Sequence, residues 1–162
     1  MPKLFLILIC LLFLLTRLYK IADVPPSVYW DEASIGYNAY SILQSGKDEW
    51  GEFLPLHFRA FGEFKLPIYI YSVIPFVQFF GLNEFSIRIP AVLFSLGVLI
   101  LTYLLAKKIS ASEIVGLYSA FLLTLSPWFF IFSRTGFEVT AGLVFYLLGI
   151  YLFLRLHLEG VN

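Results

Sequence analysis

The sequence predicts an all-α polytopic membrane protein, with about four transmembrane helices and with amphipathic juxtamembrane helices in a long first external loop. Of its 162 residues, 60% are hydrophobic and only 14% are charged, whereas a soluble domain has about 25% charged residues. This composition excludes a water-soluble globule and a disordered tail. Because eleven acidic residues balance eleven basic ones, the net charge gives no reason to expect a nucleic-acid partner.

Five apolar runs are candidate membrane helices, since about 20 apolar residues are needed to cross the hydrocarbon core. The first run has no small-residue cleavage site after it, so we expect an uncleaved helix and not a signal peptide. The second run is interrupted by Pro67 and Pro75, and we expect it to lie in the membrane interface. The five runs are residues 4–18, 66–82, 89–106, 114–132 and 139–154.

Charge placement favours four spans over five. If the second run is interfacial, the basic groups between and beyond the spans fall on the cytoplasmic side, as the positive-inside tendency requires. If the second run crosses instead, Lys107 and Lys108 fall outside. We therefore expect a cytoplasmic N-terminus. The cytoplasmic groups are then Lys3, Lys107, Lys108, Arg155 and His157, and the spans are about 4–21, 89–106, 114–132 and 139–156.

The external loop, from about residue 22 to residue 88, is expected to contain interfacial helices at about 31–45 and 66–82. In the first of these, apolar residues recur with the spacing of an amphipathic helix, and Gly46 supplies a stop. Asp31 and Glu32 fall in its first turn. They either cap the helix or act as a metal site or a general base, and spacing alone leaves both alternatives open.

Four further charged residues lie near the outer face. Lys65 is either an anchor that snorkels to the headgroups or a phosphate ligand, and Arg17 is expected to snorkel. Arg134 and Glu138 either form a local salt bridge at i, i+4 spacing or serve a site. With four spans, Glu138 faces the same side of the membrane as Asp31.

Several motifs resemble, in order and spacing, the N-terminal part of the GT-C glycosyltransferases that use polyprenyl-phosphate sugars. This group includes the protein O-mannosyltransferases and the lipid A aminoarabinose transferases, and the resemblance is to glycosyltransferase family 39. The motifs are YWDEA at 29–33, GYN at 36–38, KLPIY at 65–69, FGLNEFSIRIP at 80–90, and SPW at 126–128 followed by Ser133, Arg134 and Glu138.

The resemblance implies transfer of a sugar from a polyprenyl-phosphate donor to a lipid, glycan or protein acceptor at the outer face of a bacterial or archaeal plasma membrane, with inversion. It implies that Asp31 is the catalytic base, that Glu32 supports it and that Lys65 binds the donor phosphate. Arg88 and Arg134 are expected to bind that phosphate too. In some relatives two such acids hold a divalent metal, which here would place Mg²⁺ or Mn²⁺ on Asp31 and Glu138.

Two features depart from the family pattern. The acid after Arg134 is a glutamate with a different spacing from the aspartate of the aminoarabinose transferases, and the chain has fewer spans than family enzymes. We therefore expect residues 1–162 to be a fragment, the N-terminal part of a GT-C membrane domain. The alternative is a small non-catalytic membrane module that binds a lipid-linked sugar or a partner subunit. A channel or transporter half is disfavoured because the spans contain almost no polar groups.

Overall fold

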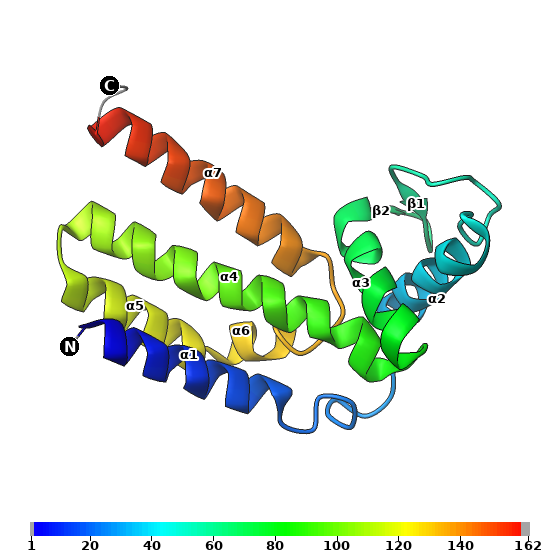
Figure 1. Cartoon of the computed structure of the whole chain (residues 1–162), viewed down its shortest axis with the longest axis horizontal. Helices are drawn as coiled ribbons and strands as arrows, with labels where there is room; N and C mark the ends of the chain where they lie inside the picture. The colour runs from blue at the N-terminus through cyan, green and yellow to red at the C-terminus, as the bar shows by residue number, and fades with distance from the viewer. Residues whose placement is uncertain (1, 160–162) are drawn as a thin grey trace.

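The computed structural model describes residues 2–159, and it is helical almost throughout (Figure 1). This confirms the all-α class predicted from the sequence. One short antiparallel hairpin, β1 with β2, was not expected. The elements are α1 (Pro2–Leu18), α2 (Trp30–Ser45), β1 (Phe58–Arg59), β2 (Phe64–Lys65), α3 (Pro67–Phe80), α4 (Glu84–Ser110), α5 (Glu113–Leu125), α6 (Pro127–Phe132) and α7 (Val139–Glu159).

Helix α4 is the central element, and it contacts α1, α2, α3, α5 and α7. Its 27 residues span about 40 Å at 1.5 Å per residue. Local residues mark both the beginning and the end of this helix. The Asn83 side chain accepts a hydrogen bond from the backbone N–H of Ser86, and Lys107 and Lys108 lie in the last turn, where the helix dipole favours cations.

Two helices in the described part, α4 and α7, are long and apolar enough to cross a membrane. The run 114–132, expected as one helix, forms two, α5 and α6. The break is at Ser126, whose backbone is extended (φ −62°, ψ 122°). Pro127 explains this, because a proline disfavours helical backbone at the residue before it and has no N–H to continue the helix.

The two external loops predicted from the sequence meet at one end of the helix bundle. Figure 1 shows α2, α3 and the hairpin at this end, whereas the α4–α5 turn and the start of α1 lie at the opposite end. The segment between α6 and α7 joins the first group, because the Gly136 N–H donates to the Glu32 carboxylate over 2.8 Å. The segment after α6 therefore lies beside the start of α2, and the number of spans stays a prediction.

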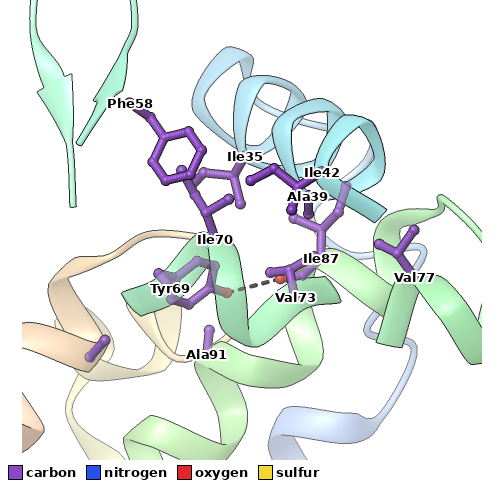
Figure 2. Close-up of a cluster of buried hydrophobic side chains, with 11 residues drawn as sticks. Ile35, Ala39, Ile42, Phe58, Tyr69, Ile70, Val73, Val77, Ile87 and Ala91 are labelled. Carbon is purple, nitrogen blue, oxygen red and sulfur yellow. Dashed lines mark hydrogen bonds between the residues drawn. The ribbon is translucent and has the colours of Figure 1, made fainter. Parts of the chain in front are cut away.

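An apolar cluster holds α2 and α3 against the start of α4 (Figure 2). Tyr69 is fully buried there and donates from its hydroxyl to the Ile87 carbonyl over 2.9 Å. Close approach requires glycine at two positions. A Cβ atom at Gly36 would lie 2.6 Å from Ile87 Cδ1, and one at Gly136 would lie 2.7 Å from Ile87 Cγ2. Ile87 therefore packs closely against α2 and against the segment after α6.

Candidate active site

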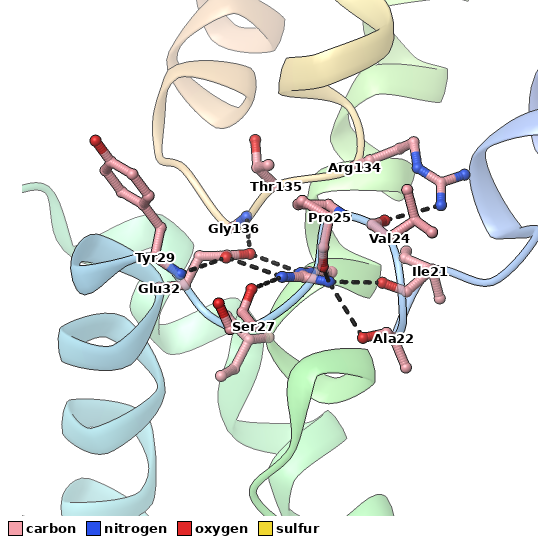
Figure 3. Close-up of polar contacts among 12 residues, drawn as sticks. Ile21, Ala22, Val24, Pro25, Ser27, Tyr29, Glu32, Arg134, Thr135 and Gly136 are labelled. Atoms are coloured by element: carbon pink, nitrogen blue, oxygen red, sulfur yellow. Dashed lines mark hydrogen bonds and ion pairs between the residues drawn. The ribbon is translucent and has the colours of Figure 1, made fainter.

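Glu32 is the centre of a buried polar network (Figure 3). Its side chain is 1% exposed, and it pairs with Arg88, which is 0% exposed. Oε1 accepts from Arg88 Nε and from the Gly136 N–H, both over 2.8 Å. Oε2 accepts from Arg88 Nη2 over 3.1 Å and from the Tyr29 N–H over 3.0 Å. Both oxygens therefore accept hydrogen bonds. Glu32 caps α2 and also connects α2 to α4 and to the segment after α6.

Arg88 uses its remaining donors on the segment between α1 and α2. Nη1 donates to the carbonyls of Ile21 and Pro25 over 2.9 and 3.0 Å, and Nη2 donates to the Ser27 carbonyl over 2.7 Å. A phosphate would have to displace these bonds, because the guanidinium is buried and occupied on every side. Arg88 therefore joins α2, α4 and the segment between α1 and α2.

Arg134, the second arginine predicted to bind phosphate, caps the end of α1. Nη1 donates to the Thr16 and Arg17 carbonyls over 2.7 and 3.0 Å, and Nη2 donates to the carbonyls of Tyr19 and Val24 over 2.8 and 2.9 Å. The last carbonyls of a helix have no partner within it and favour a cation. Within residues 2–159 the ion pairs do not include one between Arg134 and Glu138.

Arg17 does not snorkel to the headgroups as expected. It is 1% exposed and lies between the rings of Phe13 and Phe130, at 4.7 and 4.6 Å from their centroids. Its Nε donates to Ser133 Oγ over 3.0 Å, and Nη2 donates to the Thr124 carbonyl over 2.7 Å. The physical reason is the break after α5, which leaves that carbonyl without a helical partner.

Asp31 and Lys65 form a second ion pair, in which Asp31 is the more accessible member. Lys65 Nζ lies 2.5 Å from Asp31 Oδ1 and 3.2 Å from Glu63 Oε1. The side chains of Asp31 and Glu63 are 17% and 63% exposed, whereas that of Lys65 is 3% exposed. The first turn of α2 and the end of β2 thus bring together two residues predicted for the site. Glu63 was not among the predicted site residues, although it lies only two positions before Lys65.

Glu138, the residue before α7, is electrostatically coupled to this pair. Burial raises the pKa of the Glu138 carboxyl, the charge of Lys65 and the Leu66 N–H offset part of that rise, and the negative charges of Glu63 and Asp31 add to it. Burial alone would lower the pKa of Lys65, but hydrogen bonds to Asp31 and Glu63 raise it on balance. Lys65 therefore pairs with two carboxylates, and the charge of Glu138 is coupled to these three groups.

The described acids do not gather into a full set of metal ligands. Across residues 2–159, His, Cys, Asp and Glu side chains form no group of three or more that could hold an ion. Lys65 already occupies Asp31 Oδ1, and Mg²⁺ demands about six oxygen ligands in near-octahedral geometry. The positive charge that the described residues supply at Asp31 and Glu138 is the ammonium of Lys65.

Replacing Glu138 should reveal its raised pKa. The folded protein binds the Glu138 proton more tightly than the unfolded chain, so this group's contribution to stability falls as pH rises from the unfolded pKa through the folded one. We expect Glu138→Gln to remove that fall. The melting temperature of the variant, relative to the native protein, should increase with pH in the window above the ordinary glutamate pKa of about 4.3. Thermal unfolding in detergent at several pH values measures this, and a relative melting temperature that decreases with pH would contradict it.

Comparison with known proteins gives one match. A family model described as dolichyl-phosphate-mannose-protein mannosyltransferase matches residues 7–161. No curated protein and no solved structure matches the chain. The matched range contains Asp31, Glu32, Lys65 and Glu138, together with the arginines that fix the surrounding loops.

Proposed function

Because the chain belongs to the dolichyl-phosphate-mannose-protein mannosyltransferase family, a family of membrane glycosyltransferases, we propose that it transfers mannose from a polyprenyl-phosphate mannose to an acceptor hydroxyl at the outer face of the membrane. The family description favours a protein hydroxyl over a lipid or glycan acceptor. The observation that carries the proposal is the pair of a partly exposed Asp31 with a buried Lys65, at the end of the bundle that α2, α3 and the hairpin form.

Asp31 is the general base in this proposal. A hydroxyl is a weak nucleophile, and a carboxylate within hydrogen-bond reach takes its proton as the new bond forms. Lys65 holds Oδ1, and no side chain or backbone group of residues 2–159 donates to Oδ2. That second oxygen is open to an acceptor. Glu32 is excluded as the base, since both of its oxygens accept bonds from buried donors.

Lys65 stabilises the leaving group. When the acceptor oxygen attacks the anomeric carbon, the bond from that carbon to the phosphate oxygen breaks and the polyprenyl phosphate leaves with the bonding electrons. A fixed cation is most effective where such negative charge develops. One displacement, without a covalent sugar intermediate, inverts the anomeric configuration.

Lys65→Met tests the proposed phosphate contact. We expect about tenfold weaker binding of a long-chain polyprenyl phosphate, a change of about 1.4 kcal/mol, and no change for the uncharged polyprenol. Binding of the radiolabelled lipids to the purified chain in nanodiscs measures both. Lys107→Met is the matched control, because Lys107 also pairs with a carboxylate but lies at the other end of the bundle. Native phosphate affinity in Lys65→Met would contradict the assignment.

We also propose the topology. Helices α1, α4, α5 with α6, and α7 cross the membrane, and α2 and α3 lie on its outer surface within the loop 22–88. Helix α3 has 14 residues, or about 21 Å, too short for a hydrocarbon core of about 30 Å. Lys107 and Lys108 then lie on the cytoplasmic side with the N-terminus, as the positive-inside tendency favours.

Cysteine labelling in intact cells tests this topology. On a Cys10→Ser background, single cysteines are placed at Glu52, Val139 and Ser110, which are all exposed. We expect an impermeant thiol reagent to label positions 52 and 139 at once and position 110 only after permeabilisation. Labelling of 52 and 110 with protection of 139 would show that α3 crosses and that Glu138 is separated from Asp31 by the bilayer.

A further inference from the structure

A groove of about 400 Å³ lies between α4 and α7, at the end of the bundle opposite the proposed site. Figure 1 shows the turn after α4 and the C-terminal half of α7 together at this end. We call this feature the basic groove. Its lining combines two ammonium groups, one phenol and two apolar side chains, which belong to Lys107, Lys108, Tyr151, Leu104 and Ala111.

The two walls of the basic groove are polar at the end of the bundle and apolar farther in. On α4, Lys108 follows Leu104 by four residues, and on α7, Arg155 follows Tyr151 by four residues. Residues with this spacing share one face of a helix. Leu148, three residues before Tyr151, is on the same face of α7 and is exposed. A ligand that lies along the groove therefore meets cations at one end and apolar side chains at the other.

The charges at this end of the bundle favour an anionic ligand. Of the five lining residues, two are cations and none is an acid. Two acids lie nearby in the sequence. Glu113 pairs with Lys107 over 2.5 Å from outside the lining, and Glu159 is the last residue of α7. Arg155 adds a third basic side chain on α7. Adjacent cations at the edge of a membrane attract anionic headgroups.

We propose that the basic groove binds the phosphate headgroup of an anionic phospholipid, whose acyl chains continue along Leu104 and Leu148 into the bilayer. Basic pockets between membrane helices on the cytoplasmic side recognise such headgroups. The inference goes beyond the proposed function, because the groove and Lys65 lie at opposite ends of the bundle. Lysines that only obey the positive-inside tendency would give the groove no advantage over other basic residues at the same end.

Lys108→Met tests the groove by the binding of phosphatidylglycerol to the purified full chain in a neutral detergent, with bound lipids counted by native mass spectrometry. We expect about fivefold weaker binding of the first lipid, which corresponds to about 1 kcal/mol for one basic group. Lys108→Arg keeps the charge and should bind nearly as the native protein does. Lys3→Met is the matched control. Lys3 lies in the first turn of α1, at the same end of the bundle but outside the groove, and we expect native binding.

Three results would overturn the basic groove. One is native affinity of Lys108→Met for phosphatidylglycerol, and another is an equal loss in Lys3→Met, which would show a diffuse effect of charge. The third is equal affinity of the native protein for phosphatidylcholine, which has the same acyl chains but no net charge. Lys65→Met should bind phosphatidylglycerol as the native protein does. Failure of the groove and failure of the donor site are therefore distinguishable, because each has its own variant and its own lipid.

Discussion

Asp31→Asn is expected to lower mannose transfer by about 10²–10⁴-fold, the usual contribution of a general base, while leaving the fold unchanged. The amide has the shape of the carboxylate and can still accept a bond from Lys65, but it cannot take the proton of an acceptor hydroxyl. Membranes that contain the expressed protein are supplied with labelled polyprenyl-phosphate mannose, and the label that reaches hydroxyl acceptors is counted. The melting temperature of each variant is measured alongside.

Glu63→Gln is the matched control for this experiment. Glu63 contacts the same ammonium group and carries the same charge, but its side chain is 63% exposed and lies farther from Lys65 Nζ, at 3.2 Å. We expect transfer close to native. An equal loss in both variants would mean that negative charge around Lys65 matters and not the proton acceptor. Native transfer in Asp31→Asn would show that Asp31 is not the base, whereas an absence of transfer by the native protein would favour the non-catalytic module that the sequence left open.

The helices of the external loop could be predicted because their determinants are local. An amphipathic helix expected at 31–45 is α2, Trp30–Ser45, and it ends where Gly46 adopts a left-handed conformation with φ 72°. The run expected at 66–82 contains α3, Pro67–Phe80, which begins with a proline at its first turn. Whether these helices lie in the membrane interface stays a prediction.

The roles of the charged residues could not be predicted, because their partners are distant in sequence. Adjacent residues of a helix point about 100° apart, so Asp31 faces Lys65 while Glu32 faces the buried Arg88. Nothing in the spacing distinguishes these two acids. Likewise, Arg134 binds carbonyls more than a hundred positions earlier in the chain. The local salt bridge with Glu138, one of the two alternatives that the i, i+4 spacing left open, is not among the ion pairs of residues 2–159.

Arg88→Met is expected to destabilise the protein by about 3–5 kcal/mol, because it leaves the Glu32 carboxylate buried without its charge partner. The pair joins three segments that are far apart in sequence, through Arg88 to Ile21 and Ser27 and through Glu32 to Gly136. Denaturant unfolding in detergent measures the loss. Lys107→Met removes half of an exposed pair, whose side chains are 44% and 38% accessible, and should cause no measurable change.

The double variant Glu32→Leu, Arg88→Met separates two losses of stability. One comes from an unpaired buried charge, and the other comes from losing the connection that Glu32 and Arg88 make between the three segments. Removing both charges should restore part of the lost stability, since apolar replacements of a buried ion pair are often tolerated. Transfer should stay low in the double variant, because α2 has lost the bonds that orient Asp31 against the segment after α6. Asp31→Asn should show the complementary result, low transfer at native stability. A double variant that recovers native transfer would mean that Glu32 and Arg88 do not position the base.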